Sequence, residues 1–152
     1  MKLTGALLLC LMATPLLAKE RLGAYQSWAA FKDAEVPRCY AIGSPDESSG
    51  IGGYVSVGFW PKRGLSHQLN VRLSRTRSSN AGITLSVGGR RFQLAADGNT
   101  GRAKDRAMDL AIIAAMRSSQ SMIVQSSGIT DAYALRGAAS AIDAAALGCA
   151  GK

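Results

Sequence analysis

The side chains that most resemble catalytic groups are Ser66 and His67, the single histidine of the chain. A serine hydrolase needs a nucleophile, a base and an orienting carboxylate that meet in space, and two adjacent residues do not create that geometry. The surrounding GLSHQ segment also lacks the final glycine of a nucleophile elbow. We therefore expect His67 to be a surface residue at the start of a strand, with a cell-envelope hydrolase as the less favoured alternative.

Asp105 and Asp109 are a second pair whose spacing could support catalysis, because residues four apart lie on one face of a helix. Arg102 and Arg106 lie on the neighbouring turn, which favours a solvated, salt-linked surface instead. The glycine-rich segment 50–53 lacks the third glycine of a dinucleotide fingerprint and indicates a turn. The chain also offers too few histidine and cysteine ligands for a zinc site. The sequence thus predicts no catalytic residues, no metal and no cofactor.

Arginines gather in the middle of a chain whose net charge is +8 and whose isoelectric point is about 9.9. We expect an anion-binding face on two neighbouring strands, formed by Arg72, Arg75, Arg77, Arg90 and Arg91. Such a face favours anionic envelope lipids or glycans, or an unidentified envelope protein, as partners. The alternative is a solvated basic surface that binds no ligand.

The first 18 residues have the layout of a secretory signal peptide, in which Lys2 precedes a short apolar run and charged residues follow Ala18. The run is well short of the ~20 residues that span a bilayer. We therefore expect residues 1–18 to be cleaved and residues 19–152 to form one periplasmic domain that does not span the membrane. A lipoprotein modified at Cys10 is the alternative, which the bulky Leu9 disfavours. Export argues against nucleic acid as a partner.

Removal of the leader leaves two cysteines, Cys39 and Cys149, in an oxidising compartment. An even number of cysteines in an exported chain favours a disulfide. This bridge would tie the start of the domain to its end. Two separate buried thiols are the alternative.

Short runs of alternating apolar and polar residues predict strands, most of them in the first two thirds of the chain. We expect strands at residues 38–42, 54–60, 68–74, 83–87, 90–94, 121–126 and 133–136. Gly88 and Gly89 can adopt the positive φ angles of a tight hairpin turn. Leu69, Val71 and Leu73 are expected to face the core.

Two helices are predicted in the second half of the chain, at residues 102–117 and 137–147. The first is apolar nearly all round, as in a helix buried against a sheet. Trp28 and Trp60 are expected in the core, with exposed binding aromatics as the alternative. The predicted fold class is α+β, mainly β: an antiparallel β-sandwich-like domain with two helices in the C-terminal half.

The order of these features resembles the invasion-associated locus B family of small exported bacterial proteins. The resemblance covers residues 24–149 and rests on an early tryptophan, Cys39 with Tyr40, and the segments 88–94 (GGRRFQL), 112–117 (IIAAMR), 122–124 (MIV) and 133–142 (YALRGAASAI). It implies a β-sandwich-like periplasmic domain of Gram-negative bacteria with an envelope role or a loose link to host-cell invasion. It brings no established catalytic residues. Relatives often carry additional cysteines around the first one, whereas residues 29–38 here hold none.

Three classes of function follow. A non-enzymatic envelope or interaction protein is favoured, and a hydrolase of cell-wall or lipid substrates is the first alternative. A periplasmic inhibitor, such as a lysozyme inhibitor, is the second. Lysozyme is itself basic, so the positive charge of this chain opposes that association.

Overall fold

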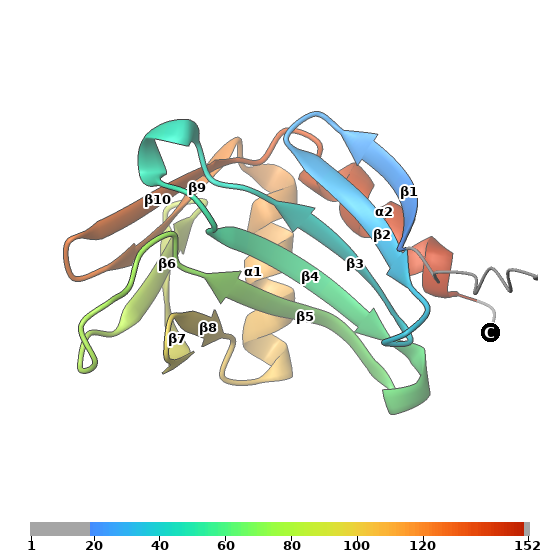
Figure 1. Ribbon diagram of the computed structural model, residues 1–152, viewed down its shortest axis with the longest axis horizontal. Coiled ribbons are helices and arrows are strands. Elements are labelled where there is room, and N and C mark those ends of the chain that lie inside the picture. Colours follow the sequence, from blue (N-terminus) through green and yellow to red (C-terminus); the bar gives the residue numbers. More distant parts are fainter. Residues whose placement is uncertain (1–18, 151–152) are drawn as a thin grey trace, which may run out of the picture.

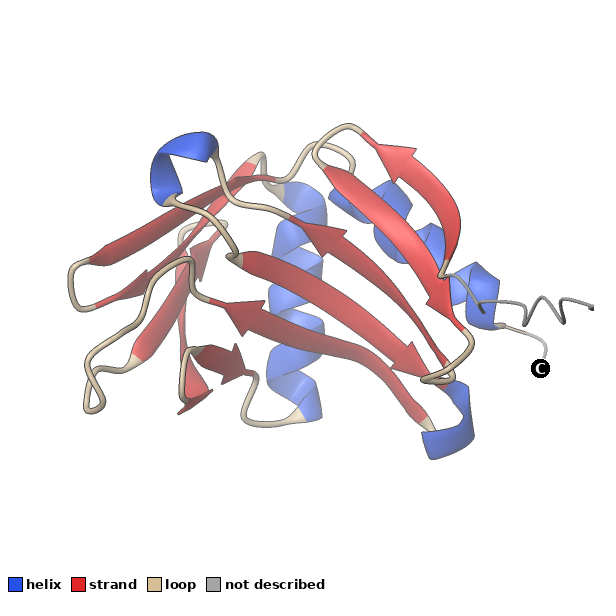
Figure 2. Cartoon of the chain, in the orientation of Figure 1, coloured by secondary structure: helices blue, strands red, loops and turns tan. Residues whose placement is uncertain are grey.

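The computed structural model describes residues 19–150, in which one antiparallel sheet is covered on one face by two helices (Figures 1 and 2). The predicted signal peptide, with Cys10, lies outside the described residues. The predicted fold class, mainly antiparallel β with two helices in the C-terminal half, is confirmed. No helix in the described part of the chain has the length and apolar character needed to cross a bilayer.

Ten strands form the sheet in the spatial order β1-β2-β3-β4-β5-β8-β7-β6-β9-β10. Their bounds are β1 (Glu20–Tyr25), β2 (Trp28–Asp33), β3 (Arg38–Gly43), β4 (Tyr54–Trp60), β5 (Leu65–Arg72), β6 (Ile83–Val87), β7 (Arg90–Asp97), β8 (Thr100–Arg102), β9 (Ser121–Ser126) and β10 (Ile129–Ala134). Two short 3-10 helices, η1 (Glu47–Ser49) and η2 (Pro61–Arg63), precede and follow β4.

β7 joins the two parts of the sheet. Its first half pairs with β6, from Arg90 opposite Val87 to Leu94 opposite Ile83, and its last three residues pair with β8. β1 to β5 and β8 therefore form one part, while β6, β9 and β10 form the other (Figure 1). The two layers of the domain are therefore this continuous sheet and the helices behind it.

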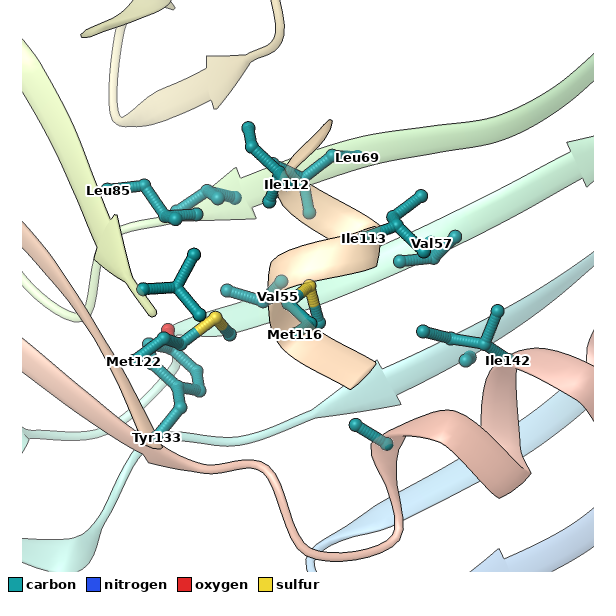
Figure 3. Close-up of a cluster of buried hydrophobic side chains, with 14 of the residues drawn as sticks. Val55, Val57, Leu69, Leu85, Ile112, Ile113, Met116, Met122, Tyr133 and Ile142 are labelled. Carbon is teal, nitrogen blue, oxygen red and sulfur yellow. The ribbon is translucent and has the colours of Figure 1, made fainter. Parts of the chain in front are cut away.

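The two helices lie behind the sheet in Figure 1 and close the core. α1 (Arg106–Ser118) packs on β5 and β6, and α2 (Ala138–Cys149) packs on β1 to β4. Figure 3 shows the buried cluster where both helices meet the sheet, with Ile112, Met116 and Ile142 against Val55 and Val57. Leu69, Val71 and Leu73 are buried as predicted.

The predicted start of the first helix at residue 102 is wrong. Gly98 has a φ of 53° and Thr100 bonds back to the Asp97 carbonyl, so the chain reverses and residues 100–102 form β8. The helix begins later, where the Asp105 carboxylate caps it by accepting from the Met108 amide at 2.8 Å.

The predicted strand at 133–136 is also misplaced, since β10 ends at Ala134. Its inward side chains are Ile129, Asp131 and Tyr133. The buried carboxylate of Asp131 interrupts the apolar alternation, which conceals the strand in the sequence. The β1–β2 hairpin was not predicted either.

Cys39 and Cys149 form the predicted pair, with Sγ atoms 1.98 Å apart and Cα atoms 5.8 Å apart. The bond joins β3 to the end of α2, and Cys39 is fully buried. Trp28 is a core residue as predicted, and its indole donates to the Ala134 carbonyl at 2.9 Å.

Candidate functional site

The five predicted anion-binding arginines do not form one cluster. Arg72 ends β5, whereas Arg90 and Arg91 begin β7, and β8 lies between these two strands. The prediction of two neighbouring strands was wrong because residues 100–102 insert a strand there. The end of β7 next to Arg72 is Asp97, seven residues from Arg90, or up to about 23 Å along a strand.

The Arg77 side chain binds backbone carbonyls of its own loop and of the β7–β8 turn. Its guanidinium donates to the carbonyls of Ser78 at 3.1 Å and Ser79 at 2.9 Å, and also to those of Gly98 and Ala81. These bonds hold the 73–82 loop together and engage Nε and Nη1 of the guanidinium. Arg75 is exposed in the same loop.

Arg90 and Arg91 border a separate shallow groove of about 400 Å³ on β6 and β9. The Arg90 guanidinium lies over the Phe92 ring, 4.8 Å from its centroid. Ser86 and Gln125 supply polar groups to this groove. The anion-binding role of the five arginines stays a prediction, but they offer two separate surfaces rather than one face.

The residues considered for hydrolysis have other partners. The Ser66 hydroxyl accepts from Arg106 at 3.4 Å, and His67 packs edge-on against Phe59 with ring centroids 4.8 Å apart. Burial and the nearby Arg106 and Arg117 lower the pKa of His67, so its ring is neutral at pH 7. No hydrogen bond joins Ser66 to His67 among the described residues.

A better candidate lies on the face of the sheet opposite the helices, which we call the outer face. Phe31, Tyr40, Gly58 and Gln68 stand opposite one another across β2 to β5. The Phe31 and Tyr40 rings stack at 5.6 Å between centroids. A side chain at Gly58 would clash with the indole of Trp60, so the glycine lets this ring lie flat on the strand.

Beside this ring is a polar depression of about 300 Å³ that we call the Trp60 hollow. Its functional lining consists of Trp60, Arg63, Gln68, Asn70, Arg102 and Asp109. These residues come from β4, η2, β5, β8 and α1. Sequence reasoning missed this grouping and expected Trp60 in the core, although Trp60 is only partly buried.

The hollow forms because only part of one edge of β5 pairs with a neighbouring strand. β8 pairs with residues 70–72 alone, so the amides of residues 65–69 on that edge need other partners. The Asp109 carboxylate of α1 accepts from the Leu69 amide at 2.8 Å. This bond brings the first turns of the helix to the sheet edge and closes one side of the hollow.

The electrostatics of the hollow favour an anion. Partial burial raises the pKa of Asp109, which weakens its preference for the charged form, and Arg106 acts in the opposite direction. The two guanidinium groups of Arg63 and Arg102 outnumber this one carboxylate. The Oδ1 of Asn70, which also lines the hollow, is buried and accepts no hydrogen bond from residues 19–150.

No protein-family model, curated protein or solved structure matches this chain. The hollow must therefore be interpreted from its own chemistry: an aromatic wall, amide groups and two arginines, which together suit a polar, negatively charged ligand.

Proposed function

We propose that this protein is an exported, non-enzymatic envelope protein that binds an anionic envelope component in the Trp60 hollow. The observation that carries the proposal is the presence of Arg63 and Arg102 around a polar hollow with one aromatic wall. Arginine pairs well with phosphate and carboxylate groups, because its planar fork donates two parallel hydrogen bonds.

Export is supported by the signal-peptide pattern of residues 1–18 and by the Cys39–Cys149 pair, since disulfides persist in oxidising compartments. A periplasmic location in a Gram-negative bacterium, with an envelope or invasion-related role, is what the resemblance to the invasion-associated locus B family implies. The net charge of +8 supports an anionic partner through long-range attraction.

Binding without catalysis is supported by the contacts of the polar residues at the site. Asp105 caps α1 and Asp109 holds a strand amide, so the two carboxylates serve the fold. The neutral His67 is packed on Phe59 rather than on a nucleophile.

The proposal is tested with glycerophosphoglycerol, a soluble phosphodiester, titrated into the protein and followed by NMR chemical shifts. We expect saturable binding that weakens at least tenfold in an R63Q/R102Q variant. An R75Q/R91Q variant removes the same charge from exposed positions outside the hollow and serves as the matched control. Equal weakening in both variants would reduce the interaction to net charge and overturn the proposed site.

A further inference from the structure

A second depression lies on the other side of η2. It is a mostly apolar groove of about 310 Å³ that includes Ala34, Pro37, Pro61, Gly148 and Cys149, and we call it the apolar groove. The β2–β3 turn, η2 and the end of α2 meet there, at the end of the molecule that also carries the disulfide (Figure 1). A further apolar hollow shares Pro61 and Cys149 with it and extends it toward Phe59 and Leu65.

The two binding surfaces meet at four consecutive residues. Trp60 and Arg63 line the polar hollow, while Pro61 and Lys62 line the apolar groove. A ligand with a charged end and an apolar end could therefore contact both surfaces around this single turn. Neither surface alone indicates a ligand with both a charged and an apolar end, but the two adjacent surfaces together do.

The charges around the apolar groove favour an anionic amphiphile. Its carboxylate, Asp33, is already compensated by Lys19 at 3.9 Å and by Arg38 at 3.8 Å. Lys62 adds an exposed ammonium group at the rim. A second copy of this strongly basic chain would be repelled at such a rim, whereas an anionic headgroup would be attracted.

We propose that the ligand is an anionic lipid, with its phosphate in the Trp60 hollow and its acyl chain in the apolar groove. This inference rests on the proposed function and specifies its partner. Burial of each methylene group changes an affinity about fourfold, so an acyl chain that enters the groove adds a measurable increment to headgroup binding.

The test compares dihexanoyl phosphatidylglycerol, below its micelle concentration, with glycerophosphoglycerol, which has the same headgroup and no chains. We expect the lipid to bind at least tenfold more tightly than the headgroup. Ala34→Asp places a charge in the apolar groove at an exposed turn position, and it should remove this difference while the headgroup affinity stays unchanged. Ile51→Asp, at a 97% exposed residue near the opposite end of β3, is the control and should change neither affinity.

Pro37→Asp, at another exposed residue of the apolar groove, is a second variant in case Ala34→Asp perturbs folding, and it should likewise weaken lipid binding while headgroup binding stays unchanged. Equal affinity for lipid and headgroup would overturn the lipid assignment while the proposed function stands. Absence of headgroup binding would instead overturn the proposed function. Dimerisation without lipid that Ala34→Asp abolishes, measured by analytical ultracentrifugation, would assign the apolar groove to a second copy and contradict the proposal.

Discussion

His67 shows how a side chain with catalytic potential becomes part of the structure. Its φ of 58° lies in the left-handed region, and its Nδ1 is buried without a partner among residues 19–150. The ring packs against Phe59, which is a core residue. Neither the backbone angle nor the contact can be read from the Ser66–His67 dipeptide, because both depend on how β4 and β5 pair.

We predict that His67 makes the fold sensitive to mild acid. Its pKa is lowered from 6.5 in the folded protein, so below about pH 6.5 the unfolded chain binds a proton that the folded chain resists. The free energy of unfolding should therefore fall as the pH decreases from 6.5 through the folded pKa. Denaturant unfolding at several pH values measures this. His67→Asn, which tolerates the left-handed backbone and does not titrate, should lose this part of the pH dependence.

Asp109 should make the ligand affinity of the Trp60 hollow depend on pH, and this affinity should increase in acid. Burial raises the pKa of Asp109 and Asp105 adds to this rise, while the hydrogen bond from Leu69, Arg106 and His67 act in the opposite direction. Arg63 and Arg102 line the same hollow. Acidification neutralises this carboxylate and makes the hollow more positive. We expect the affinity for glycerophosphoglycerol, whose own charge is constant, to rise several-fold from pH 7 to pH 4.

The control for this second prediction is Asp109→Asn, which keeps an acceptor for the Leu69 amide. The variant should bind with the higher affinity already at pH 7. Titration of the His67→Asn variant in parallel separates the protonation of His67 from that of Asp109. An unchanged pH profile in Asp109→Asn would contradict the role of the carboxylate.

At the scale of single elements, the 73–82 loop depends on Arg77. Its guanidinium bonds the carbonyls of Gly98, Ser78, Ser79 and Ala81, so this one side chain holds the loop against the β7–β8 turn. We expect Arg77→Gln to lower the free energy of unfolding by about 1.5 kcal/mol, the lower end of the range for hydrogen bonds to charged groups, because three of the four bonds are exposed. Arg75→Gln, in the same loop and exposed, should change it by less than about 0.5 kcal/mol. Urea denaturation of both variants measures the difference, and equal effects would contradict a structural role for Arg77.

Elements with strong local signals were predicted well. β4, β6 and β9 have the predicted bounds, and Gly88 and Gly89 have the positive φ angles of 57° and 73° that the hairpin needs. β8 was missed because its three residues are a strand only by pairing with β5 and β7. The local sequence pattern identifies an element whose own residues favour that structure. It fails for an element, such as β8, that forms only by pairing with strands distant in the sequence.

At the scale of the whole molecule, the Cys39–Cys149 bond closes a loop across a sequence separation of 110 residues. A bridge of this span restricts the unfolded chain by about 4–5 kcal/mol in the chain-entropy model. We expect a Cys39→Ala/Cys149→Ala variant to lose about that much stability in guanidinium unfolding. Reductant should destabilise the wild type and leave the double variant unchanged, and a loss below about 1 kcal/mol would contradict the prediction.

The strands and helices with regular apolar spacing, the fold class and the cysteine pair could be predicted from the sequence, because they depend on local periodicity and on the number of cysteines. Only the tertiary structure decided that β8 enters between β5 and β7, which separates Arg72 from Arg91 and removes the predicted single arginine face. It also placed Trp60, Arg63 and Arg102 around one hollow. The physical reason is that a binding site is formed by residues distant in sequence, and strand pairing, which local pattern does not specify, brings them together.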